Sequence, residues 1–64
     1  MNRKERFKAA RKALGLTQVE FAEKLGMTQA GISAIESGRV KTSDRMIQIL
    51  SNTFSINAEW LRTG

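Results

Sequence analysis

Cysteine, histidine and proline are all absent from this chain of 64 residues. Without cysteine and histidine there can be no disulfides, thiol nucleophiles or imidazole acid–base chemistry, and the usual zinc sites are excluded. No apolar run approaches the ~20 residues that cross a bilayer, and the charged first residues are not followed by the apolar segment of a leader peptide. We therefore expect a soluble intracellular protein that is not an enzyme and has no metal, cofactor, small-molecule ligand or membrane partner.

Positive charge is in clear excess. The chain has 11 Lys and Arg residues against 6 Asp and Glu residues, a net charge of +5, which favours a polyanionic partner. Much of this excess lies near the start of the chain, where one acidic residue, Glu5, stands among Arg3, Lys4, Arg6, Lys8, Arg11 and Lys12. Taken singly, each of these is best interpreted as part of a solvated helix face. Together they could still steer the protein onto phosphates.

The length predicts a single domain over residues 1–64, with a core of a size that rarely supplies more than about 3–5 kcal/mol of net stability. Such a small core favours an all-helical bundle with well-capped helices. The chain shows no linker, repeat or low-complexity stretch, and its apolar spacing predicts five helices. The first spans about residues 3–14, with a capping box of Asn2 and Glu5 and a stop at Gly15. Its inner face comprises Phe7, Ala10, Arg11 and Leu14.

The next two helices each begin with Thr-Gln. Thr17 caps the second helix in a Thr-x-x-Glu box, and Gly26 ends it. Thr28 caps the third helix, which ends near residue 36. The apolar positions predicted to face inward from this pair are Phe21, Ala22, Leu25, Ile32 and Ile35.

The last two helices follow a loop over residues 37–44. Thr42 or Ser43 can cap the fourth helix, whose core-facing stripe is Met46, Ile47, Leu50 and Phe54. Asn57 can cap a short fifth helix, with Ile56 and Leu61 placed to form a hydrophobic staple. Trp60 could stack on a base or ligand, but beside the staple residues it is expected to close the core together with Leu61.

The spacing between the second and third helices favours a helix-turn-helix unit. Two helices that meet at roughly 90–120° need a small side chain where their backbones approach and a turn residue that tolerates positive φ. Ala22 and Gly26 meet these needs. An ordinary helical hairpin would also use caps and a glycine, yet it does not require both residues at these offsets. The exposed side of the third helix would then carry Gln29, Ala30, Ser33 and Ala34.

Several segments carry a resemblance to a known family. They are Gly15-Leu16-Thr17-Gln18, Phe21-Ala22-Glu23-Lys24-Leu25-Gly26, Thr28-Gln29, Ile32-Ser33, Ile35-Glu36-Ser37-Gly38 and Trp60-Leu61-Arg62-Thr63-Gly64. Through them the chain resembles the DNA-binding domains of lambdoid phage repressors and Cro proteins, in the Cro/cI (XRE) family. The resemblance implies a compact, all-α, five-helix lambda-repressor-like domain with the helix-turn-helix at its second and third helices.

The resemblance also implies which residues read bases. It makes Gln29 the best candidate, since Gln can bond adenine N6 and N7 together. Other candidate base contacts on the same helix are Ser33, Ala30, Ala34 and Thr28. Ala30, Gly31 and Ala34 replace longer polar side chains that relatives often have, so few direct contacts are expected. Either DNA shape or the neighbouring Arg39 and Lys41 would supply the remaining specificity.

Contacts with the DNA phosphate backbone are implied by the same resemblance. Gln18 is expected to bond a phosphate and to orient Gln29, and Arg11 to pair with Glu36 in a partly buried salt bridge while also touching phosphate. The remaining candidate phosphate contacts are Ser37, Arg39, Lys41, Thr42 and Ser43. Ordinary solvation is the alternative for Arg39 and Lys41.

The function implied is a phage or prophage-type repressor in the bacterial cytoplasm, at the nucleoid, that binds a pseudo-palindromic double-stranded operator as a homodimer. Candidate dimer contacts are Ile56, Ala58, Glu59 and Arg62. Two alternatives stay open, an antitoxin-like module that mainly binds a protein and a nonspecific binder of nucleic acid. The chain could equally be a complete Cro-like protein or the first domain of a longer one.

Overall fold

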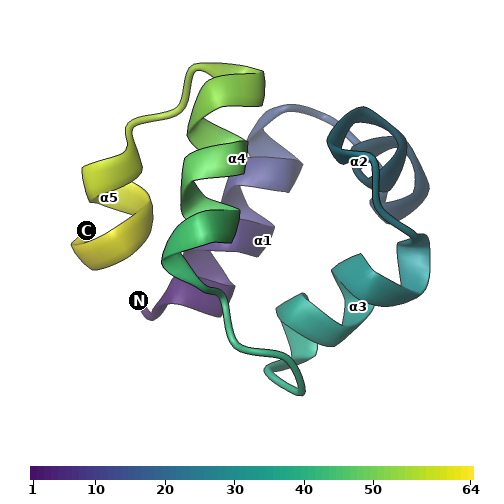
Figure 1. The fold of residues 1–64 in the computed structure, drawn as a ribbon, viewed down its shortest axis with the longest axis horizontal. Coiled ribbons are helices and arrows are strands. Elements are labelled where there is room, and N and C mark those ends of the chain that lie inside the picture. Colours follow the sequence, from purple (N-terminus) through teal and green to yellow (C-terminus); the bar gives the residue numbers. More distant parts are fainter.

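The computed structural model describes all 64 residues and contains five helices and no strands (Figure 1). The helices are α1 (Arg3–Ala13), α2 (Gln18–Leu25), α3 (Gln29–Ser37), α4 (Asp44–Phe54) and α5 (Ala58–Thr63). The all-α, five-helix prediction is confirmed. Figure 1 shows α1 and α4 at the centre, with α5 on one side of them and α2 and α3 on the other.

Capping explains why the helices begin where they do. At every helix start an Asn, Thr or Ser side chain accepts the backbone N–H three residues later, as the cap pattern predicts. At α1 and α2 the third residue is a glutamate that bonds back to the cap, which completes the capping box. The cap of α4 is Ser43, whose hydroxyl accepts the Met46 amide at 3.1 Å, whereas Thr42 is buried with only 5% of its surface exposed.

Phe21 lies at the centre of the core and joins three helices. Its ring meets Phe7 of α1 edge to face, with centroids 5.4 Å apart, and stacks on Phe54 of α4 at 5.2 Å. Aromatic pairs of this kind contribute about 0.5–1.5 kcal/mol beyond the area that they bury. The largest fully buried side chains are Phe7, Phe21, Ile32, Ile47, Leu50 and Leu61. All of them were predicted core positions.

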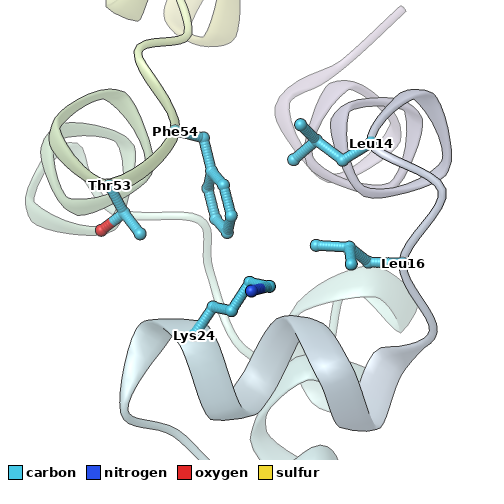
Figure 2. A pocket seen from close by; sticks show the side chains of 5 residues that line it. All are labelled: Leu14, Leu16, Lys24, Thr53 and Phe54. Atoms are coloured by element: carbon cyan, nitrogen blue, oxygen red, sulfur yellow. The ribbon is translucent and has the colours of Figure 1, made fainter.

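Two predicted core residues are instead exposed. Leu14 is 39% exposed; it is the C-cap of α1, and its side chain borders an open recess of about 450 Å³. Figure 2 shows Phe54 in this recess, between Thr53 on one side and Leu14 and Leu16 on the other, with Lys24 below. No residue of α3 lines the recess.

The expectation that Trp60 closes the core was wrong as well. Trp60 is 38% exposed, whereas its neighbour Leu61 is 1% exposed. Consecutive residues on a helix point about 100° apart, and on α5 the Leu61 side chain faces the core while the Trp60 side chain is turned toward the surface. Leu61 takes the inner position, and Ile56 packs partly buried against the core.

Arg6 is an inward-facing charge that the sequence did not indicate. It is 7% exposed and donates to the Leu61 carbonyl at 3.1 Å, to the Arg62 carbonyl at 3.0 Å and to the Met1 carbonyl. Arg3 donates to the same Arg62 carbonyl at 3.3 Å. A guanidinium group at the C-terminal carbonyls of a helix satisfies them and complements the helix dipole. The two arginines therefore hold α5 against α1 and keep the chain ends close (Figure 1).

Candidate nucleic-acid interface

The turn between α2 and α3 has the geometry that the sequence predicts. Gly26 adopts a left-handed conformation with φ of 69°, and the Met27 amide N–H donates a hydrogen bond to the Ala22 carbonyl at 2.8 Å. Ala22 is 2% exposed, so a small side chain occupies the close approach. In Figure 1 α2 is seen nearly along its axis while α3 lies across the view, so the two helices cross steeply.

One face of α3 is turned away from the core. Ile32 and Ile35 are buried on the inner side of the helix, whereas Gln29, Ala30 and the cap Thr28 are exposed. Ser33 and Ala34 are half-buried on the same outer side. The outer surface of α3 therefore begins with one long polar side chain and continues with short ones, as the sequence indicates.

Gln29 is held by a chain of side-chain hydrogen bonds. Its Nε2 donates to Gln18 Oε1 at 2.6 Å, and Gln18 Nε2 donates to Glu36 Oε1 at 3.1 Å. A carboxylate can only accept, so Glu36 determines which end of the Gln18 amide faces it. The Gln18 oxygen is thereby turned toward the Gln29 nitrogen. The expected orienting contact between Gln18 and Gln29 is present, and it extends to Glu36.

The network ends on the expected pair of Arg11 and Glu36. Arg11 Nε lies 2.7 Å from Glu36 Oε2 and its Nη2 lies 3.1 Å from Oε1, a bidentate arrangement. The Arg11 and Glu36 side chains are 11% and 4% exposed. Arg11 Nη1 also donates to the Leu16 carbonyl at 2.9 Å, just before the cap of α2. A single ion pair therefore joins α1, the start of α2 and the end of α3.

The loop after α3 presents most of the donors predicted there. Ser37, Arg39, Lys41 and Ser43 are exposed. Arg39 Nε donates to Ser37 Oγ at 3.2 Å, and the Ser37 hydroxyl itself donates to the Ala34 carbonyl at 3.1 Å. Gly38 makes the turn possible with φ of 85°. Thr42 differs from the expectation because its side chain is buried and its carbonyl accepts from Arg3 Nη1 at 3.1 Å. Its hydroxyl is therefore not among the surface donors.

A family model described as "Helix-turn-helix" matches residues 7–61, which include every helix of the bundle except the first turn of α1 and the end of α5. The chain belongs to the helix-turn-helix family of the Cro/cI (XRE) type.

Three similar proteins are described as HTH-type transcriptional regulators for conjugative elements. They are the regulators for R391 from Providencia rettgeri, SXT from Vibrio cholerae and pMERPH from Shewanella putrefaciens, each 40% identical over 60 residues, covering 94% of this chain. The chain spans 27% of the length of each of these relatives. No solved structure matches the chain.

Two further observations concern the helix-turn-helix domain as a whole. None of its helices is both long enough and apolar enough to pass through a bilayer. Its acidic residues form no group that could hold a metal ion.

The residues expected at a dimer contact lie on and beside α5. Ile56 and Ala58 are half-buried, and Glu59 pairs with Arg62 at 3.1 Å. Arg62 also lies 3.6 Å from Asp44, which Arg3 contacts at 2.9 Å. These ion pairs connect α5 to the start of α4 within one chain. The exposed Trp60 belongs to the same helix, so α5 presents both charge and a large apolar side chain to its surroundings.

Proposed function

We propose that this domain binds a pseudo-palindromic DNA operator as a homodimer, represses transcription there and reads bases in the major groove with α3. The hydrogen-bonded series Gln29, Gln18 and Glu36 is the observation that carries the proposal. The printed descriptions of the relatives as HTH-type transcriptional regulators support it. We further propose that the domain acts in the cytoplasm, at the bacterial nucleoid.

Gln29 is proposed to read adenine. One Nε2 hydrogen is engaged by Gln18, which leaves the second Nε2 hydrogen and the Oε1 acceptor free on an exposed side chain. This donor and acceptor match N7 and N6 of adenine, and a bidentate pair of this kind supplies about 1–3 kcal/mol of discrimination. A glutamine already fixed by a neighbour loses less conformational entropy on binding, which favours this residue as a reader.

The rest of the α3 surface is proposed to make fewer and shorter contacts. Ser33 can donate to or accept from a base edge, as can the cap Thr28, and the Ala30 and Ala34 methyl groups can touch a thymine methyl. With one long reader per half-site, much of the specificity would come from the shape and deformability of the operator.

The proposed phosphate contacts surround this surface. They comprise Gln18, Ser37, Arg39, Lys41 and Ser43, together with Arg11 through the two N–H groups that its bonds to Glu36 and Leu16 leave free. Thr42 is omitted because its side chain is buried.

Dimerisation is proposed to use the α5 region, through Ile56, Ala58, Glu59 and Arg62. The exposed Trp60 indole beside them supports this assignment, since aromatic side chains are enriched at interfaces. The two domains of such a dimer would bind two operator half-sites about one turn of the DNA helix apart.

Selection of duplexes from a randomised library, followed by fluorescence anisotropy on the selected duplex, tests the proposal. We expect Gln29→Ala to lose its preference at one base pair in each half-site, with a loss of about 1–3 kcal/mol on the preferred base. Gln48→Ala is the matched control, because Gln48 is exposed on α4 and bonds only Asn52. An unchanged base preference in Gln29→Ala would contradict the assignment.

The same assay separates this proposal from binding by charge alone. Charge-only binding at 150 mM salt would give a Kd of about 10⁻⁴–10⁻⁶ M and no preferred site. Recovery of no consensus sequence, together with such weak binding, would refute sequence-specific recognition. A consensus with two related half-sites would support both the specificity and the proposed dimer.

A further inference from the structure

The basic residues of α1 divide into two kinds. Each arginine is engaged by the fold, since Arg3 pairs with Asp44, Arg6 bonds the end of α5 and Arg11 pairs with Glu36. The lysines behave differently. Lys4, Lys8 and Lys12 are exposed, and their ammonium groups take part in no hydrogen bond or ion pair. We refer to these three residues as the lysine stripe.

The lysine stripe forms one wall of a groove. Residues four apart lie on the same side of a helix, so the three ammonium groups follow one line along α1. They border a shallow groove of about 420 Å³ that also includes Glu5, Ala9 and Glu36. Because Glu36 belongs to α3, the groove lies between α1 and the C-terminal half of α3. At one end Lys4 covers the turn after α3, where a methyl group added to Gly38 would lie 3.1 Å from the Lys4 Nζ.

The carboxylates of this groove are already bound within the fold. Glu36 is engaged by Arg11 and Gln18, and Glu5 accepts the Asn2 backbone amide at 2.9 Å. Like charges four residues apart on a helix destabilise it by about 0.2–0.5 kcal/mol per pair. Glu5, three residues before Lys8, offsets part of this repulsion, but no ion pair of the fold engages the three ammonium groups. A bound polyanion would offset the remaining repulsion.

We infer that the lysine stripe is a second phosphate-binding surface, which holds the DNA strand that passes Gln18 and runs along α1. This inference rests on the proposed function and adds a surface distinct from the loop over residues 37–43. Glu36 links the lysine stripe to Gln18, the proposed phosphate anchor at the start of α2, because it lines the groove and also accepts from Gln18. Eight residues of helix span about 12 Å, and phosphates of one strand recur about every 3.4 Å along the duplex axis. The stripe is therefore long enough for about three phosphates.

Salt dependence of binding provides the test. Each phosphate contact contributes about 0.9 to the slope of log K against log salt concentration. On the selected duplex we expect Lys8→Gln to lower the slope by about 0.9, and Lys4→Gln/Lys8→Gln/Lys12→Gln to lower it by about 2.7, with base preference unchanged. Lys24→Gln is the matched control: it removes the same charge from an exposed lysine at the recess of Figure 2, and its slope should stay that of the wild type.

The outcomes are distinguishable. If the wild type binds the selected duplex specifically but Lys8→Gln and Lys24→Gln lower the slope equally, the effect is one of net charge and the inference is overturned. An unchanged slope in the triple variant overturns it as well. If the wild type itself shows no preferred sequence, it is the proposed function that fails. Thermal unfolding provides the folding control, since the three ammonium groups are exposed and form no ion pair, so the triple variant should remain folded with a melting temperature near that of the wild type.

Discussion

Replacing Arg11 by methionine should nearly abolish folding. The change leaves the Glu36 carboxylate, whose side chain is 4% exposed, without the two guanidinium bonds of 2.7 and 3.1 Å. Only the Gln18 amide remains to solvate it. Breaking a buried pair by removing one partner costs about 3–5 kcal/mol. A core of this size rarely supplies more than about 3–5 kcal/mol of net stability, so the variant should be largely unfolded at 25 °C.

Urea titration followed by far-UV circular dichroism measures this loss. Arg45→Met is a suitable control, because Arg45 is exposed and makes no ion pair, so its stability should stay within about 0.5 kcal/mol of the wild type. The double variant Arg11→Met/Glu36→Met removes both charges and should recover much of the stability, since apolar residues of similar volume often replace a buried pair at little cost.

A coupling energy of about 2–3 kcal/mol between Arg11 and Glu36, from the double-mutant cycle of these variants, would show that the pair acts as a buried unit. A loss below about 1 kcal/mol in Arg11→Met is the value typical of an exposed ion pair. That result would refute the reasoning, because it would mean that water reaches Glu36 in place of Arg11.

Three further predictions concern backbone conformation and pH. Gly26→Ala should destabilise the domain by about 1–2 kcal/mol, because φ is 69° there and no neighbouring atom lies within 4 Å of an added methyl group, so left-handed strain is the only cost. Ser55→Gly should instead stabilise the domain by about 0.5–1 kcal/mol, because Ser55 adopts a φ of 56° at the end of α4. Thermal melts in which both variants shift the melting temperature in the same direction would contradict this account. Hydrogen bonds from the Thr17 backbone amide and hydroxyl, with help from Lys24, lower the pKa of Glu20 below its ordinary 4.5. A carboxyl with a lowered pKa in the folded state stabilises the protein above its unfolded pKa and ceases to do so as the pH falls through the folded value. The stability difference between the wild type and Glu20→Gln should therefore be constant at neutral pH and shrink below pH 4.5, and a difference that does not depend on pH would exclude this role.

The helix boundaries could be predicted because their causes are local. A cap side chain acts on an amide three residues away, and a glycine ends a helix through its own φ, so both signals can be found within a few neighbouring residues. Asn2, Thr17, Thr28 and Asn57 all cap helices where the sequence predicts. The one open choice, Thr42 or Ser43, depended on which of the two was buried, and burial is not a local property.

The amino-acid sequence by itself thus determined the helix starts, the helix-turn-helix spacing and the periodic apolar positions that became the core. Only the tertiary structure decided which of the basic residues of α1 are held by distant groups and which are not. Arg6 bonds carbonyls at the far end of the chain. Leu61 faces the core while its neighbour Trp60 is exposed, and the Gln29 amide is oriented through Glu36 by an arginine on another helix. Each of these contacts joins residues that are far apart along the chain or chooses between neighbours that compete for one site. Periodicity and spacing do not carry that information, because it depends on how the helices pack.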